Sequence, residues 1–132
     1  MNEIIIDNVI LCRHIVKKDI KEGLCFFSND REYIQVGSWK YNSGKKLDKH
    51  IHNRIQRTID RTNEVLYIVK GEIKANIYDL KGTYINSIVI REGEILILME
   101  CGHGYEILED NTQVIEVKNG PYLGPDIDRK RF

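Results

Sequence analysis

The sequence lacks an excess of charge of either sign, an apolar run long enough to span a membrane, and the cysteine pairs of a disulfide framework. Lysine plus arginine and aspartate plus glutamate each total 20 in 132 residues, so no global positive field attracts nucleic acid or an anionic membrane. No stretch approaches the roughly 20 apolar residues of a transmembrane helix. The three cysteines, Cys12, Cys25 and Cys101, are odd in number and lack metal-knuckle spacing. We therefore expect reduced thiols, no nucleic-acid partner and no membrane partner.

The start of the sequence also lacks the features of an export signal. Residues 1–12 have no basic n-region and no small-residue cleavage site, and they contain Glu3 and Asp7. We therefore expect a cytoplasmic protein. Its composition, with 42% hydrophobic and 30% charged residues, is typical of a globular protein, and 132 residues suit one domain.

Short segments separated by turn signals make up most of the sequence. Ile73, Ala75 and Ile77 alternate with polar neighbours, which is the period of a half-buried strand, and Asp79-Leu-Lys-Gly82 predicts a hairpin turn. Further extended segments are expected at residues 4–6, 9–11, 24–27, 32–40, 84–90, 95–98, 103–108 and 113–118. One helical turn is expected at 17–22 and a surface strap or frayed end at 124–132. Because long helical periodicity is missing, the sequence predicts an all-β sandwich or barrel.

Two histidines and a glutamate form the pattern most suggestive of chemistry. His50 and His52 are two residues apart, so on a strand both imidazoles would project from one face, a geometry that suits chelation of a metal ion. Glu64 begins the next apolar segment, on the same face as Leu66 and Ile68. A carboxylate at the head of a buried face needs a compensating charge, and a cation beside the two histidines would supply it.

These residues resemble the first motif of the cupin superfamily, G-x5-H-x-H-x3,4-E-x6-G. The matching positions in this sequence are Gly44, His50, His52, Glu64 and Gly71. Eleven residues, rather than three or four, separate the second histidine from the glutamate, which predicts a longer loop at that point.

The second cupin motif, G-x5-P-x-G-x2-H, is matched more loosely between Gly93 and His103, with Met99 at the proline position. The resemblance therefore implies that His103 is the third histidine of a metal site that also contains His50, His52 and Glu64. The sequence looks most like small stand-alone bacterial cupins, through Glu-Val-Leu-Tyr at 64–67, Gly-His-Gly-Tyr-Glu at 102–106 and Lys-Asn-Gly-Pro-Tyr at 118–122. Some of these are associated with surface-polysaccharide sugar pathways.

The resemblance covers about residues 35–118 and implies a double-stranded β-helix, the jelly-roll barrel of cupins. It implies a single cupin domain over residues 1–132, in which residues 1–34 add strands that cover the barrel or form a dimer interface and residues 119–132 are a tail.

The expected donors leave open positions for water or substrate and suit one divalent ion, either Fe, Mn, Ni or Zn. Our leading hypothesis is a metal-dependent enzyme that isomerises or epimerises a small polar substrate such as a sugar or sugar nucleotide. Tyr105 or Glu106 would move the proton while the ion polarises an oxygen. An Fe(II)-dependent dioxygenase and a non-catalytic small-molecule or carbohydrate sensor are the alternatives, because this barrel supports many activities.

Other residues are candidates for substrate binding. Arg54, Arg57 and Arg61 are three and four residues apart, so one helical turn would gather them for a phosphate or carboxylate; the alternative is a solvated loop. Tyr41 is a candidate for the cavity wall, with core packing as the alternative. The segment after Glu64 is apolar on both faces, so it needs cover from the N-terminal segment or from a second subunit, and we expect a homodimer.

Overall fold

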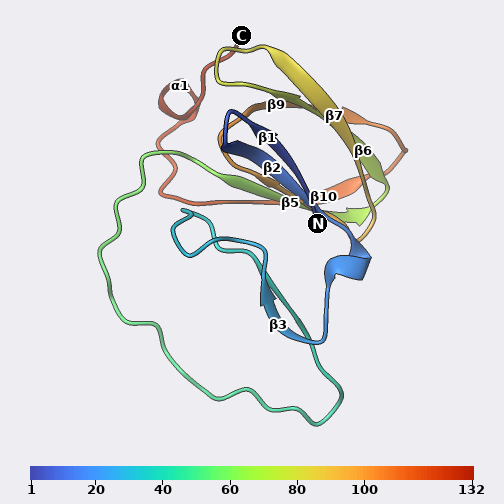
Figure 1. Cartoon of the computed structure of the whole chain (residues 1–132), viewed down its shortest axis with the longest axis vertical. Helices are drawn as coiled ribbons and strands as arrows, with labels where there is room; N and C mark the ends of the chain where they lie inside the picture. Colours follow the sequence, from blue (N-terminus) through green and yellow to red (C-terminus); the bar gives the residue numbers. More distant parts are fainter.

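The computed structural model describes all 132 residues as an antiparallel, all-β architecture of three sheets (Figure 1). The largest sheet has, in spatial order, strands β1 (Asn2–Ile6), β2 (Val9–Ile15), β8 (Ile95–Leu98), β5 (Glu64–Lys70) and β10 (Gln113–Lys118). The second sheet has strands β7 (Tyr84–Arg91), β6 (Glu72–Tyr78) and β9 (Gly102–Ile107). A separate hairpin pairs β3 (Gly23–Phe26) with β4 (Gly37–Lys40), and the helical segments are η1 (Lys17–Asp19) and α1 (Pro125–Asp128). No helical segment has the length and apolar character that a bilayer crossing requires.

The inner core lies between the five-stranded and the three-stranded sheet. Alternation along β6 buries Ile73, Ala75 and Ile77 and leaves the intervening residues half-buried, as predicted. Leu66 and Ile68 of β5 pack into the same cluster from the facing sheet. Burying a large aliphatic side chain stabilises the fold by roughly 1.5–3 kcal/mol, so this shared cluster holds the two sheets together as layers.

An outer core covers part of the other face of the five-stranded sheet. Phe27 and Ile34, from the segment between β3 and β4, pack on Ile15, Val65 and Ile97. The strand β5 is therefore buried on both faces at its start, while Tyr67 and Val69 further along its outer face stay exposed.

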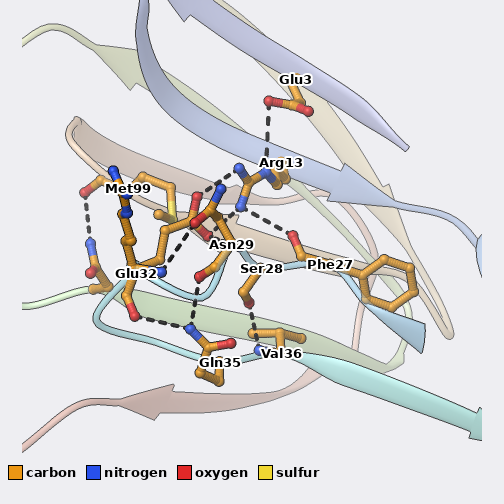
Figure 2. A network of polar contacts seen from close by, with 11 residues as sticks. Glu3, Arg13, Phe27, Ser28, Asn29, Glu32, Gln35, Val36 and Met99 are labelled. Atoms are coloured by element: carbon orange, nitrogen blue, oxygen red, sulfur yellow. Dashed lines mark hydrogen bonds and ion pairs between the residues drawn. The ribbon is translucent and has the colours of Figure 1, made fainter. Parts of the chain in front are cut away.

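A buried arginine fastens this covering segment to the sheet (Figure 2). Arg13 of β2 is 5% exposed, and its Nη1 and Nη2 donate to the two carboxylate oxygens of Glu32 at 2.5 and 2.7 Å. Nη1 also donates to the carbonyl of Phe27 at 3.1 Å, and the backbone N–H of Asn29 donates to Glu32 at 2.9 Å. Burial alone would raise the pKa of Glu32, but the hydrogen bonds from Arg13 and from the backbone of Asn29, together with the charge of Arg13, outweigh it and lower that pKa. The segment is thus held by a charge-assisted, two-point contact.

Two tight turns connect consecutive strands. Gly71, between β5 and β6, has φ of +84°, and a Cβ there would lie 2.3 Å from Oγ1 of Thr112. Only glycine fits this position without strain. The turn predicted at 79–82 is confirmed, because the N–H of Gly82 donates to the carbonyl of Asp79 at 3.1 Å.

The segment between β4 and β5, which we call the 41–63 loop, has no regular secondary structure beyond a short turn near its start. Residues 41–61 are all exposed, and the loop swings away from the sheets in a wide arc (Figure 1). The prediction that His50 and His52 lie on a strand is wrong. No neighbouring strand pairs with this segment, so its backbone groups have no ladder to join.

The helical turn that would gather Arg54, Arg57 and Arg61 is also absent, and the alternative of a solvated loop is what the structure has. Extended, solvent-exposed backbone keeps the three guanidinium groups from gathering on one face. A single unpacked helical turn has little stability in water, because nucleation is costly and no tertiary contact offsets it.

The all-β class is confirmed, and strands occur at most of the predicted positions. The strand expected at 32–40 begins only at Gly37, because residues 28–35 form the bonded segment around Glu32. No sheet closes on itself, since β1 and β10 remain edges of the largest sheet. The strand order thus describes a sandwich of open sheets.

The C-terminal tail lies as a strap against the end of the sandwich. The ring of Phe132 packs edge-on against Tyr78, with ring centroids 5.2 Å apart. A Cβ on Gly82 or Gly102 would come within 2.9 and 2.8 Å of the same ring. The predicted surface strap is confirmed, and two glycines make room for it.

Candidate functional site

The candidate site is built around Glu64, a carboxylate on the inner face of the sandwich. Glu64 begins β5 and lies between Leu98 of β8 and Lys118 of β10 in the sheet register. The strand alternation that buries Leu66 and Ile68 also directs Glu64 inward, and only 8% of it is exposed. A charged group this buried must be paired, and the structure pairs it with three side chains.

The partners of Glu64 come from both layers of the sandwich. Its Oε2 atom lies 3.1 Å from Nε2 of His103 and accepts a hydrogen bond from the hydroxyl of Tyr105 at 3.4 Å, both on β9 of the facing sheet. Its Oε1 atom lies 2.7 Å from Nζ of Lys118, which also contacts Glu116 at 2.8 Å. One carboxylate oxygen therefore contacts the facing three-stranded sheet, and the other contacts a neighbouring strand of its own sheet.

These contacts set the charge of the carboxylate. Burial alone would raise the pKa of Glu64, but hydrogen bonds from His103 and Lys118 outweigh it and lower the pKa from 4.5 to about 2. Burial and the nearby Glu64 charge have the opposite effect on Tyr105, whose pKa they raise well above its usual value. At neutral pH the site holds an ionised carboxylate beside a protonated phenol.

His103 has one ring nitrogen without a partner. Its Nδ1 atom is buried and makes no hydrogen bond, while Nε2 faces Glu64. The imidazole stacks on Tyr105, with ring centroids 5.3 Å apart and 27° between the planes. The side chain of His103 is 27% exposed, so the site opens to solvent on its side.

Sequence reasoning missed Lys118 as a member of this site. Its contact with Glu64 depends on the antiparallel register of β5 and β10, which pairs the last residue of one strand with the first of the other. Local sequence gives no measure of that register. The signal that could have found it is the lysine next to the Asn-Gly-Pro-Tyr segment, at the end of the Gln-Val-Ile-Glu-Val-Lys strand.

Two asparagines fix the end of the 41–63 loop beside the site. The N–H of Asn63 donates to Oδ1 of Asn119 at 2.6 Å, and Nδ2 of Asn119 donates to the carbonyl of Arg61 at 3.1 Å. Nδ2 of Asn63 donates to the carbonyl of Met99 at 3.1 Å. These hydrogen bonds connect the start of β5, at Glu64, with the end of β10, at Lys118.

The structure brings together two of the four predicted metal ligands. Glu64 and His103 are in contact, whereas His50 and His52 lie in the exposed 41–63 loop with their rings 5.1 Å apart. No group of three or more histidine, cysteine, aspartate or glutamate side chains gathers at a point that could hold a metal ion. The remaining two ligands stay a prediction.

The other predicted site residues are dispersed. Tyr105 is in the site, but Glu106 lies on the opposite face of β9, where it pairs with Lys74 at 2.8 Å and with Asn76. Tyr41, Arg54 and Arg57 are exposed residues of the 41–63 loop. Arg61 lines an open cavity of about 470 Å³ beside Asn63, together with Arg31, Glu32, Tyr33, Asp60, Met99 and Glu100.

Comparison with known proteins does not assign the chain to a family. No family model, no curated protein and no solved structure shows significant similarity to it. The chemical character of the site therefore depends on its own geometry: a fixed carboxylate and an imidazole in contact, a lysine behind the carboxylate and a phenol beside it.

Proposed function

We propose that Glu64 and His103 are the fixed half of a divalent-metal site, completed by His50 and His52. The observation that supports this is the 3.1 Å separation of Nε2 of His103 and Oε2 of Glu64. Two donors bound to one ion at about 2.1 Å and at right angles lie about 3 Å apart, so the pair is spaced for a shared ion. The donors are a carboxylate and an imidazole, which suit Fe, Mn, Ni or Zn.

The carboxylate oxygen that Lys118 contacts supports this assignment. It occupies Oε1 of Glu64, which leaves Oε2 directed toward His103. Metal-binding carboxylates commonly have their second oxygen held in this way by an outer group that orients them.

On this basis we propose a metal-dependent enzyme that acts on a small polar substrate, such as a sugar or sugar nucleotide, by isomerisation or epimerisation. A bound ion supplies Lewis-acid polarisation of a substrate oxygen. Tyr105, held protonated beside Glu64, is placed to donate a proton or a hydrogen bond to that oxygen. Arg61 is the loop arginine nearest β5 and offers a contact for a phosphate group on the substrate.

We also propose that the two main sheets are the halves of a double-stranded β-helix. The support is that Glu64 of the first matched motif, on β5, and His103 of the second, on β9, face each other across the inner core and come into contact.

Metal content of purified variants tests the proposed site. After growth in metal-replete medium, elemental analysis should find about one divalent ion per chain in the wild type and less than a tenth of that in Glu64→Gln or His103→Ala. His14→Ala is the matched control, because His14 also contacts a glutamate, with Nε2 2.7 Å from Oε2 of Glu94. Equal metal in His103→Ala and His14→Ala, or a metal-free wild type, would show that the proposal is wrong.

A further inference from the structure

The 41–63 loop carries an apolar stripe that has no partner in its own chain. Leu47, Ile51, Ile55 and Ile59 recur every four residues and are all exposed, Ile51 by 89%. In an extended segment, residues an even number apart share a face, so these four would form one apolar edge. No hydrogen bond or ion pair joins residues 41–59 to the rest of the chain.

The sandwich carries an apolar face that also has no cover. On the outer face of β5 and β10, Tyr67 is paired with Ile115 in the register, and Val69 and Val117 flank them. These four side chains are 39–52% exposed. Phe27 and Ile34, from the segment between β3 and β4, pack on Val65 but not on these four side chains. The apolar outer face is therefore covered at the start of β5 and exposed at its end.

The β3–β4 hairpin adds a second bare apolar surface. Leu24 pairs with Trp39 in the register, and Phe26 lies two residues along the same face. All three are more than half exposed, whereas Cys25, on the opposite face, packs on the outer core. Exposed apolar side chains gathered in this way mark interaction surfaces in soluble proteins.

Charge separates the loop from the rest of the molecule. Residues 41–63 contain six lysines and arginines against two aspartates, a net charge of +4. The rest of the chain has fourteen basic against eighteen acidic residues, a net charge of −4. A body of one sign and an arm of the other are complementary between two copies of the same chain.

We propose that a second copy of this chain covers the bare outer face and that each copy's 41–63 loop delivers His50 and His52 to the Glu64–His103 pair of its partner. This inference rests on the proposed metal site. In a single chain the loop follows a wide arc away from the sheets (Figure 1), and no group of three or more histidine, cysteine, aspartate or glutamate side chains forms that could hold a metal ion. The site is then incomplete in one copy and complete in two. Exchange of a segment between identical subunits is a common route to dimers.

Mixed dimers test whether the site is shared. One chain carries His50→Ala and His52→Ala, and the other carries Glu64→Gln and His103→Ala, with different affinity tags for isolating the heterodimer after co-expression. If the loop acts in trans, the heterodimer has one intact site and should hold about one ion, half of the wild-type dimer, while each homodimer holds almost none. If the loop acts within its own chain, the heterodimer has no intact site. An empty heterodimer beside a metal-loaded wild type therefore overturns the proposal.

A loading control uses the same loop variant paired with a His14→Ala chain. This heterodimer has one intact site under either arrangement, so it should hold about one ion. A wild type that binds no metal overturns the proposed function and the shared site together. A metal-loaded wild type that is monomeric by light scattering overturns only the shared site.

The docking face is tested separately through Ile115. Ile115→Arg, with a charge in the bare outer face, should shift the protein from dimer to monomer and reduce its metal content at least tenfold, although every proposed ligand is still present. Ile127→Arg is the matched control, because Ile127 is 74% exposed on α1, away from that face. Circular dichroism confirms that both variants are folded. Dimers that persist with full metal in Ile115→Arg would contradict the proposed interface.

Discussion

The charge of Glu64 is a property of its immediate neighbours. Contacts with His103 and Lys118 stabilise the ionised carboxylate in a position where burial would otherwise neutralise it. Burial and, next to it, the charge of Glu64 raise the pKa of Tyr105 well above its usual value. An ionised carboxylate, a protonated phenol and a protonated lysine are thus held within one small region, an arrangement typical of sites that move protons or bind ions.

The low pKa of Glu64 predicts how the metal-free protein responds to acid. Because the folded-state pKa, about 2, is below the ordinary 4.5, Glu64 stabilises the fold fully above pH 4.5, and this contribution is lost as the pH falls toward 2. The lost contribution should be about 3 kcal/mol. Urea unfolding after chelator treatment, at pH 6 and at pH 2.5, measures it.

Glu64→Gln provides the comparison for this titration. Its amide does not ionise, so its stability should fall less than that of the wild type between the two pH values. Identical losses in the two proteins would show that Glu64 does not carry the effect.

At the scale of elements, the Arg13–Glu32 pair decides whether the segment between β3 and β4 stays on the sheet. Removing the charge of Glu32 leaves a guanidinium that is 5% exposed with only the more distant carboxylate of Glu3, 3.7 Å from Nε, as a counterion. Glu32→Gln should therefore lower the free energy of unfolding by about 3 kcal/mol. Glu106→Gln, which breaks the exposed pair with Lys74, should change it little. Chemical denaturation of both variants checks the contrast, and similar effects in the two would contradict it.

The sequence is most informative about elements whose pattern is local. The alternation of Ile73, Ala75 and Ile77 predicted β6, and the Asp79–Gly82 turn predicted the hairpin that follows. Local periodicity contains no information about which strands become neighbours. The pairing of β2 with β8, and the choice between an open sandwich and a closed barrel, therefore could not be predicted from it.

The candidate site was predictable only in part, for the same reason. The spacing from Glu64 to Gly71 and the place of His103 identified two residues that the structure puts in contact. Lys118 escaped because its role depends on sheet register, and Glu106 was misplaced because strand alternation sends it to the face opposite Tyr105. The two loop histidines were expected on a strand, and no strand forms there.

At the scale of the whole molecule, both ends of the chain are fastened to the body. The terminal amine of Met1 lies 2.8 Å from the carboxylate of Asp19, and the ring of Phe132 packs on Tyr78 over Gly82 and Gly102. Gly102 immediately precedes His103, so the C-terminal strap packs against β9, the strand that carries His103 and Tyr105.

Removal of the last ring should weaken the fold measurably. Phe132→Ala deletes one edge-to-face aromatic contact and should lower the free energy of unfolding by about 1 kcal/mol. Tyr122→Ala serves as the control, because that ring is 64% exposed and stacks on no other aromatic side chain. Thermal or urea unfolding measures the difference. Equal stabilities for the two variants would show that the strap does not contribute.

The exposed connection between β4 and β5 divides the chain into two interleaved parts. Residues before it supply β2 and the covering segment, and residues after it supply β8 and β5, yet four register pairs from Cys12 with Leu98 to Ile15 with Ile95 join them in one sheet. A peptide bond broken within the arc would leave two fragments with a common core. We therefore expect two separate polypeptides, divided within this arc, to assemble into the same sheet.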